Sequence, residues 1–418
     1  MKNSLADAIE PPVRRLSALL VPIRLGPLRY ARFRWLWIAG VGSFLGTWMH
    51  NVAARWTAAT LSSSPLTVSA VDTLQVLPVV LLSLGAGRLA DTIDRRRLLV
   101  TTHASLAAVT ILMGTLATVG RLGLPALLAL TAFIGVLGAL NGPAWQATVP
   151  RQVPDDEVTS AVVLISTGFN VARTIGPSVG AWVLLNFGAA SAFFTNAASY
   201  VIIGLLIWRL PPQSPHVTQV ARPSSLADPS LRRLYTIVLF FGFFAMPSLS
   251  LLPIVARDAL HGTAQTYGTL LSAFGLGAAC IGPVIAVSSR KLGYSHFVAL
   301  TCLASAGGLV LLSIAQTSLS GATGAALCGI GWIGAISTTN AAVNTRARVE
   351  VRGRALAFYL TAAVGGQAAG SFIGGLMAHR FGLSPVLYAC SLSLIVLAIV
   401  VFNLSIRTEE LRQSNSGQ

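Results

Sequence analysis

The sequence predicts an all-α membrane protein with twelve transmembrane helices, arranged as two pseudo-symmetric six-helix bundles. Three observations indicate this fold class. Of the 418 residues, 54% are hydrophobic and 10% are charged, with a mean hydropathy of +0.72, whereas soluble domains carry about 25% charged residues. The apolar residues form long runs separated by short basic segments, and short motifs of the first half return in the second.

Each apolar run is long enough to cross a bilayer, which requires roughly 20 residues. An even number of crossings places both termini on the same side of the membrane. Twelve spans are predicted, at residues 34–61, 66–90, 98–120, 123–146, 158–185, 189–208, 234–256, 264–288, 295–316, 319–343, 355–379 and 383–405.

The basic residues predict the orientation of these spans. The formal net charge is +16, and 24 of the 29 lysines and arginines lie in segments that an inside N-terminus would make cytoplasmic. Only Arg121, Arg257 and Arg380 fall in the opposite loops. Because cytoplasmic loops carry an excess of Lys and Arg, we expect both termini to be cytoplasmic in a bacterial cytoplasmic membrane. The charge then indicates a lipid bilayer as partner and no nucleic acid.

The two halves of the chain repeat each other. The GAL triplet at residues 138–140 returns as GAI at 334–336, and Phe187-Gly188 returns as Phe381-Gly382. A Pro- and Ser-rich stretch separates the halves, as is typical of a linker. We therefore expect a cytoplasmic N-terminal segment at 1–33, a first bundle at 34–210, a cytoplasmic linker at 211–231, a second bundle at 232–405 and a cytoplasmic tail at 406–418.

Residues 87–97, reading GRLADTIDRRR, place two acids and four arginines at the end of the second apolar run. This segment resembles the loop between the second and third helices of major facilitator superfamily transporters. Its D-x-x-D-R-R-R form is similar to the drug and siderophore efflux branch, which includes the enterobactin exporters. The resemblance implies that Gly87, Asp91, Arg95 and Arg96 form a conformational latch. The alternative is a charged loop that only anchors a helix end at the membrane surface. Asp91 ends a helix, where the dipole disfavours an acid, so a positive partner is expected. That partner is Arg95, Arg96 or, as the resemblance implies, the start of the eleventh helix near Arg354.

The fifth helix contains a second motif. Its segment Gly176-Pro177-x-x-Gly180 resembles the core of the antiporter motif found on this helix in the superfamily. Val163, Ala172 and Ala181 stand where the full motif has glycine, so the match is partial. Gly-Pro in a membrane helix also serves packing and bending alone, and both interpretations stay open.

Four titratable or charged residues inside the spans are candidates for proton coupling. Asp72 is the only acid deep within a span, and Arg55 is its expected partner. The pair either couples proton movement to a conformational change or only holds two helices together. His50 is expected to be a coupling residue or a hydrogen-bonded interior histidine. Arg173 is the candidate for a buried cation, since the fourth helix lacks the arginine that many proton antiporters of the superfamily have there.

Polar and aromatic residues predict the lining of a central substrate cavity. In the first half, Asn51, Gln75 and Asn170 belong to polar stripes, which turn towards the bundle interior or a water-filled cavity. The second half has no acid or base deep in a span. Its candidates are Phe240, Phe244, Trp332, Asn340, Tyr359 and Gln367. Aromatic residues on membrane helices also face lipid or core, but this combination favours a bulky, largely apolar solute, neutral or cationic.

These features predict a secondary active exporter of hydrophobic or amphipathic small molecules, working as a monomer by proton antiport and alternating access. Two alternatives stay open: a dedicated siderophore or natural-product exporter, and a non-transporting membrane sensor or scaffold. An enzyme is not expected, since the chain lacks a G-x-x-x-x-G-K-[ST] phosphate loop and a recognisable nucleophile–base pair. We expect no cofactor and no metal, since the four cysteines lack metal-ligand spacing.

Overall fold

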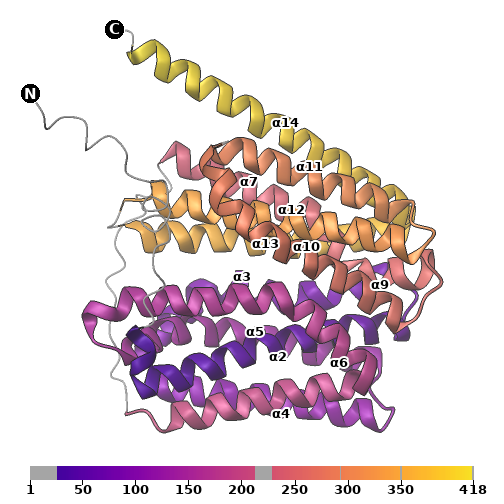
Figure 1. The fold of residues 1–418 in the computed structure, drawn as a ribbon. Coiled ribbons are helices and arrows are strands. Elements are labelled where there is room, and N and C mark those ends of the chain that lie inside the picture. Colours follow the sequence, from indigo (N-terminus) through magenta and orange to yellow (C-terminus); the bar gives the residue numbers. More distant parts are fainter. Residues whose placement is uncertain (1–25, 212–227, 292, 349–350, 417–418) are drawn as a thin grey trace, which may run out of the picture.

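A computed structural model of the chain describes residues 26–211, 228–291, 293–348 and 351–416, without the side chains of residues 83–92, 283, 286–291, 352–353 and 404–416. Figure 1 shows two groups of long helices, one above the other. Helices α2 to α6 form the first bundle, and α7 to α14 form the second. The described ranges contain helices and no strand. The predicted all-α fold of two bundles is confirmed.

The first bundle consists of five helices, the last of which covers two predicted spans. Short 3-10 helices precede α2 and join α5 to α6; they are η1 (Gly26–Arg29), η2 (Pro150–Gln152) and η3 (Asp155–Glu157). Helices α2 and α4 pack on α6, while α3 packs on α5. The long helices are α2 (Ala31–Leu61), α3 (Pro65–Thr92), α4 (Arg95–Thr118), α5 (Leu124–Thr148) and α6 (Val158–Trp208).

The second bundle begins with a helix that is interrupted in its second part. Pro247 and Pro253 lack a backbone N–H donor, which interrupts the helical hydrogen bonds there. The pieces are α7 (Pro229–Ala245), α8 (Pro247–Ser250), α9 (Leu252–Ile254) and the π-helix η5 (Val255–Ala259). The remaining helices are α10 (Ala264–Lys291), α11 (Tyr294–Ser313), α12 (Ser318–Arg346), α13 (Arg352–Phe381) and α14 (Leu383–Ser416). Helix α12 packs on α10 and α11, α13 on α7, and α14 on α11.

The sequence repeat appears in the backbone. Gly188 interrupts α6 with φ 78° and ψ 174°, and Gly382 ends α13 with φ 89° and ψ 164°. Both φ values are positive and lie in the region that favours glycine. Upstream of these breaks, a Cβ added at Gly176 would lie 2.6 Å from Trp48 in α2, and one at Gly370 would lie 2.1 Å from the carbonyl oxygen of Phe243 in α7. The equivalent helices of the two bundles thus make equivalent close contacts.

The predicted segment boundaries are covered only in part. Residues 1–25 of the N-terminal segment and 212–227 of the linker lie outside the described residues. Helix α7 already begins at Pro229, inside the predicted linker. Helix α14 continues to Ser416, so the predicted tail at 406–418 is helical as far as that residue. The TEELRQ sequence there contains no helix breaker, and Glu, Leu, Arg and Gln have high helix propensity.

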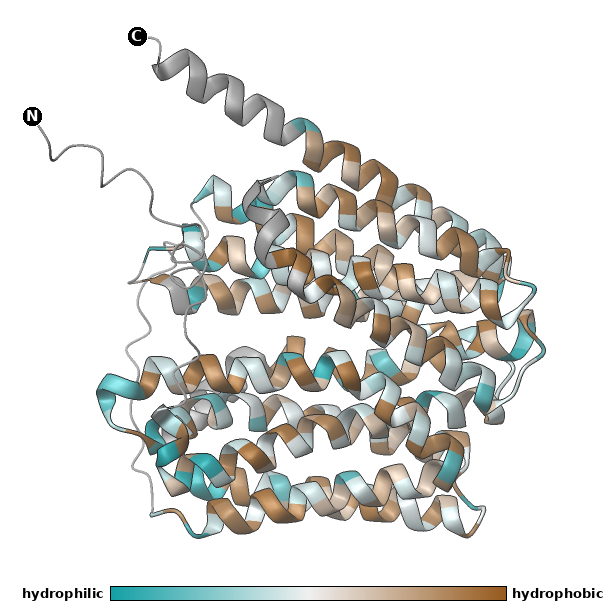
Figure 2. Ribbon diagram, viewed as in Figure 1, coloured by the Kyte–Doolittle hydropathy of each residue, from teal (hydrophilic) through white to brown (hydrophobic). Residues whose placement is uncertain are grey.

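The described chain has the apolar character of a membrane protein. In Figure 2 hydrophilic residues gather at the two ends of the bundles, while hydrophobic residues dominate along the helices. By length and composition, nine helical segments of the described residues can cross a membrane. The segment Asp155–Trp208 has 54 residues, more than two crossings need. The number of twelve crossings stays a prediction.

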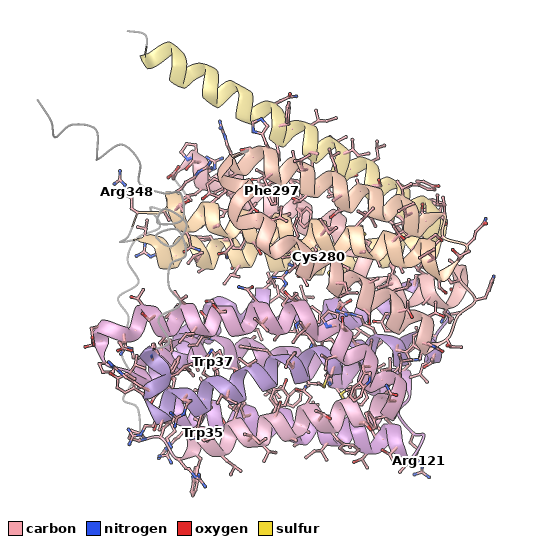
Figure 3. All side chains as sticks on the ribbon, viewed as in Figure 1. Trp35, Trp37, Arg121, Cys280, Phe297 and Arg348 are labelled. Carbon is pink, nitrogen blue, oxygen red and sulfur yellow. The ribbon has the colours of Figure 1, made fainter. Side chains whose placement is uncertain are left out.

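The two ends of the bundles can be told apart by their turns. We call the end with the α3–α4 and α12–α13 turns the near end, and the end with the α2–α3 and α4–α5 turns the far end. In Figure 3, Trp35 and Arg348 mark the near end and Arg121 marks the far end. The near end is the one that the basic residues predict to be cytoplasmic.

The bundles contact each other along a seam, which we define as the contacts of α3 with α13 and of α6 with α10. The Ser371 hydroxyl donates a hydrogen bond to the carbonyl oxygen of Ser69 at 2.8 Å, and Thr73 donates to the carbonyl oxygen of Ala368 at 3.5 Å. The apolar core of the second bundle also includes Val52, Ala181 and Leu184 of the first. These first-bundle residues lie in the far halves of their helices, so the far end is closed.

Towards the near end, the same helix faces are exposed. Residues four or seven apart share a face of a helix. Leu77 follows Thr73 by four residues, Asn170 precedes Thr174 by four, and Thr361 precedes Ala368 by seven; Leu77, Asn170 and Thr361 are all exposed. The bundles therefore separate on the near side of the seam, which leaves this interior accessible from the near end.

Candidate functional site

Arg55 and Asp72 form a buried ion pair in the far half of the first bundle. Arg55 lies six residues before the end of α2, and Asp72 lies seven residues after the start of α3. Because these helices are antiparallel neighbours with a rise of about 1.5 Å per residue, both side chains reach the same level. The Arg55 Nε donates to both Asp72 oxygens, at 2.8 and 3.0 Å, and an Arg55 Nη2 lies 2.7 Å from Oδ1. Both residues are 3% exposed, and the predicted partnership is present.

A tyrosine of the second bundle covers this pair. Tyr267 of α10 is fully buried and interacts electrostatically with both Arg55 and Asp72. Its ring stacks on Trp56 of α2, with centroids 5.4 Å apart and planes 14° apart. The ion pair therefore lies at the interface of the two bundles. Neither Tyr267 nor Trp56 belongs to a motif or a polar stripe, so the sequence did not point to them.

Polar side chains continue from the ion pair towards the near end. Gln75, one turn from Asp72, donates a hydrogen bond to Asn51 at 2.8 Å, and both are partly exposed. His50, next to Asn51, is 1% exposed, with its ring 5.0 Å from that of Phe193. Neither ring nitrogen of His50 has a hydrogen-bond partner among the described residues. The two expected roles of His50, a coupling residue or a hydrogen-bonded interior histidine, both stay predictions.

Arg173 lies at the middle of the interface between the bundles. Its guanidinium carbon is 5.8 Å from the ring centroid of Trp332 in α12, and it interacts electrostatically with Tyr359 of α13. Trp332 in turn packs on Phe241 and Phe274, at centroid distances of 6.2 and 6.4 Å. Within the described part of the chain, Arg173 makes no ion pair and no hydrogen bond. A cation of the first bundle thus meets an aromatic cluster of the second.

Other cavity candidates have local partners. The Tyr359 hydroxyl donates to the carbonyl oxygen of Ile336 at 2.7 Å, and the residue is 1% exposed. Asn340 accepts a hydrogen bond from Asn344 at 2.9 Å. The backbone nitrogen and the Cγ of Gln367 lie against Gly242 of α7. Asn170 stays exposed. Tyr359 therefore fixes α13 against α12, and its hydroxyl is already occupied.

Phe240 and Phe244 do not join this cluster. Their rings stack at 6.2 Å, and both line a groove between α7 and α14, together with Ile237 and Val396. Phe241, between them in sequence, is the residue that reaches Trp332. Successive residues of a helix point about 100° apart, so a run of aromatic residues does not reveal which one faces the interior. For these two residues the predicted place in the central cavity is wrong.

The fifth-helix motif is a contact between α6 and α2. Gly176, Pro177 and Gly180 are buried. A Cβ added at Gly180 would lie 3.0 Å from Val52 and 3.1 Å from the Cα of Met49. The motif therefore allows two helix backbones to approach closely.

The predicted latch is described only in part. Gly87 and Asp91 lie in the part of α3 for which only the backbone is described, so the contacts predicted for them lie outside the described residues. Arg95 is buried, at 5% exposure. The Arg96 backbone N–H donates to Asp94 Oδ1 at 2.9 Å, which caps α4, and its side chain donates to the carbonyl oxygen of Trp208 at the end of α6. The two arginines are thus built into the near end of the first bundle.

Across the described residues, no group of three or more His, Cys, Asp or Glu side chains could hold a metal ion. The groups that the site brings together are an ion pair and a cation against aromatic rings. Among the described residues, the buried Asp72 carboxylate has a bidentate arginine, while Arg173 lies against the Trp332 ring and makes no ion pair.

Two pseudo-symmetric bundles that meet at one end and separate at the other have the architecture of major facilitator superfamily transporters. The sequence agrees, since the profile of one family of that superfamily, described as transmembrane secretion effector, matches residues 23–418. The chain belongs to this family and is a membrane transporter.

Individual relatives show the same relationship. The chain is 25% identical to the staphyloferrin A transporter of Staphylococcus aureus (strain NCTC 8325 / PS 47), over 65% of this chain and 70% of that protein. It is 30% identical to the putative multidrug resistance protein MdtD of Pectobacterium carotovorum subsp. carotovorum (strain PC1), over 45% of this chain and 40% of that protein. A crystal structure of the nucleoside transporter NupG superposes with a TM-score of 0.67 at 13% identity, covering 89% of this chain and 98% of that one. This last likeness concerns the fold alone.

Proposed function

We propose that the protein exports hydrophobic or amphipathic small molecules across a bacterial cytoplasmic membrane in exchange for protons. It works as a monomer by alternating access, with its near end and both termini in the cytoplasm. The observation that supports coupling to protons is the buried Arg55–Asp72 pair beneath Tyr267, at the interface of the bundles.

Proton coupling would use two arrangements of the ion pair, one in contact and one separated. While Arg55 contacts Asp72, both charges are neutralised in place. If the pair separates, an unpaired charge inside the membrane costs at least about 2.5–3.5 kcal/mol. Protonation of Asp72 removes that cost on the carboxylate side. A change of bundle geometry that separates the pair therefore drives proton uptake, and proton release restores the pair.

The two sides of the membrane reach Asp72 by different routes. Tyr267 of the second bundle, stacked on Trp56, covers the pair at the closed interface. When the far end opens, Tyr267 moves away with the second bundle, and water from the far side reaches the carboxylate. In the present state the partly exposed Asn51–Gln75 pair provides the polar path towards the near end. Access that alternates between two routes is what antiport requires.

The state of the structure fits an exporter. The far end is closed, the interior is accessible from the near end, and Asp72 is paired. In this state, an exporter has released its proton into the cytoplasm and can bind a substrate from the cytoplasm. Opening of the far end then releases the substrate outside and exposes Asp72 to the proton source.

A dedicated exporter of a siderophore or natural product is the second candidate. It is supported by the 25% identity to the staphyloferrin A transporter, which extends over 287 residues. Accumulation of an iron chelator inside cells that lack this protein, and its return to the medium on re-expression, would favour this narrower function over multidrug efflux.

Transport in proteoliposomes with a pH gradient tests the coupling. Asp72→Asn should abolish dye efflux driven by the gradient and preserve substrate exchange at equal pH on both sides. Asp156→Asn, at an exposed acid of η3, is the matched control and should preserve both. Loss of both activities in Asp72→Asn would mark a packing or substrate residue. Full gradient-driven efflux in this variant would refute coupling through Asp72.

A further inference from the structure

At the interface between the bundles, Arg173 has a charge that no described carboxylate balances. Arg55 has a bidentate carboxylate. Arg173, on the face of α6 that turns towards the second bundle, has neither an ion pair nor a hydrogen bond within the described ranges. Its neighbours are the Trp332 ring and the Tyr359 hydroxyl, which is engaged with Ile336. A guanidinium has five N–H donors and no acceptor, so its donors stay available to a ligand.

An unbalanced cation inside the membrane is unfavourable and is a functional feature by default. Contact with Trp332 offsets part of that cost, because the face of an aromatic ring attracts a cation. It fills none of the hydrogen-bond donors. Packing of Trp332 between Phe241 and Phe274 holds the ring in place. The guanidinium is therefore held in one position without being neutralised there.

The side chain is also reachable from the near end. Arg173 is partly exposed, and Ser166, Phe169 and Asn170, which lie one or two turns closer to the near end on the same side of α6, are exposed. Asn170 lies one turn from Thr174, whose carbonyl oxygen contacts Gly275 of α10. This exposed strip therefore leads along the space between the bundles to Arg173, and it mixes polar groups with an aromatic ring.

We propose that Arg173 binds an anionic group of the transported molecule, such as a carboxylate, sulfonate or phosphate, while the apolar part of the molecule lies along the exposed strip of α6. The planar guanidinium suits such groups because two parallel N–H donors match two oxygens. The inference rests on the proposed export function and specifies its substrate class as amphipathic anions. It replaces the neutral or cationic solute expected from the sequence.

Two dyes that differ only by a sulfonate test this proposal. The anion is 8-anilinonaphthalene-1-sulfonate, and the neutral partner is N-phenyl-1-naphthylamine. Equilibrium binding is measured by fluorescence on the full-length protein in lipid nanodiscs, with empty nanodiscs subtracted. The wild-type protein should bind the sulfonate at least tenfold more tightly than the neutral dye. Arg173→Gln should abolish this preference without changing affinity for the neutral dye more than twofold, and Arg173→Lys should retain part of it.

The control is Arg121→Gln, which removes an exposed positive charge at the far end (Figure 3) and should keep the wild-type preference. The proposal is overturned if the wild-type protein shows no preference for the sulfonate, a result that depends on no variant. It is also overturned if Arg173→Gln keeps the preference for the sulfonate. Equal loss of affinity for both dyes would overturn it as well, because that result indicates that Arg173 only stabilises the contact between the bundles. A separate efflux assay distinguishes the export function from the anion site. If the sulfonate binds through Arg173 but is not transported, the export function is refuted and the anion site at Arg173 is still supported.

Discussion

The far end should open when Arg257 is replaced. Arg257 of η5 belongs to the second bundle, and its guanidinium donates to the carbonyl oxygens of Ala59, Ser62 and Ser63 in the first. Ala59 is one of the last four residues of α2, whose carbonyls have no partner within the helix. The arginine thus caps a helix of the opposite bundle at its negative end. Asp258 holds the guanidinium in place, at 2.9 Å from Nη2.

The magnitude follows from these contacts. Opening the far end exchanges three hydrogen bonds for water, and a net value of about 0.5–1 kcal/mol each gives about 2 kcal/mol in total. Since 1.4 kcal/mol corresponds to a factor of ten, Arg257→Gln should shift the closed-to-open equilibrium by about 30-fold towards open.

Distance measurement between spin labels checks this shift. Labels at Thr60→Cys in α2 and Leu319→Cys in α12, both exposed at the far end, report on the separation of the bundles. The exposed Cys280 is first replaced by serine. Arg257→Gln should increase the long-distance population, and Arg121→Gln should not. A distribution unchanged from that of the control would refute the reasoning.

Three further predictions concern packing, capping and the latch. Gly370→Leu should disrupt the contact of α13 with α7, since a Cβ would lie 2.1 Å from the Phe243 carbonyl oxygen; a loss of several kcal/mol should appear as a much lower unfolding temperature. Asp228 caps α7 by accepting hydrogen bonds from the Ser230 hydroxyl at 2.7 Å and from the Ser230 backbone N–H at 2.8 Å, and these two bonds lower the pKa of its carboxyl. A carboxyl with a depressed pKa stabilises the fold above its unfolded value near 4, and this stabilisation is lost as pH falls through the folded pKa. Asp228→Ala should therefore cost about 1 kcal/mol at pH 7 and less at pH 3. Asp91→Asn should reduce transport at normal membrane levels and increase cysteine labelling from the cytoplasmic side, whereas full transport with unchanged labelling would make residues 87–97 a surface anchor.

The Arg55–Asp72 pair shows what a sequence can predict about a site. A carboxylate deep in a span requires neutralisation, and only one basic residue stood at the matching level of the neighbouring helix. The prediction therefore needed only helix lengths and an antiparallel turn. Arg173 was found for the same reason, because a charge inside an apolar run is conspicuous.

The aromatic residues show the opposite case. Phe240, Phe241 and Phe244 have the same chemistry in sequence, yet only Phe241 reaches Trp332. The rotation of α7 decides this, and packing against α13 and α14 sets that rotation. Tyr267 was missed because a tyrosine near a helix end has no pattern of its own. Its importance comes from lying opposite a pair that is more than 190 residues away in sequence.

The sequence by itself determined the membrane location, the helical class, the repeat of the two halves and the residues whose charge is costly in lipid. These follow from local composition and from solvation energy, which do not depend on how the helices are arranged. Only the tertiary structure decided that the far end is closed, that Tyr267 covers the ion pair and that Arg173 lies against an aromatic ring with no ion pair among the described residues. Those facts depend on contacts between bundles, and two arrangements of the same helices satisfy the same hydrophobic pattern equally well.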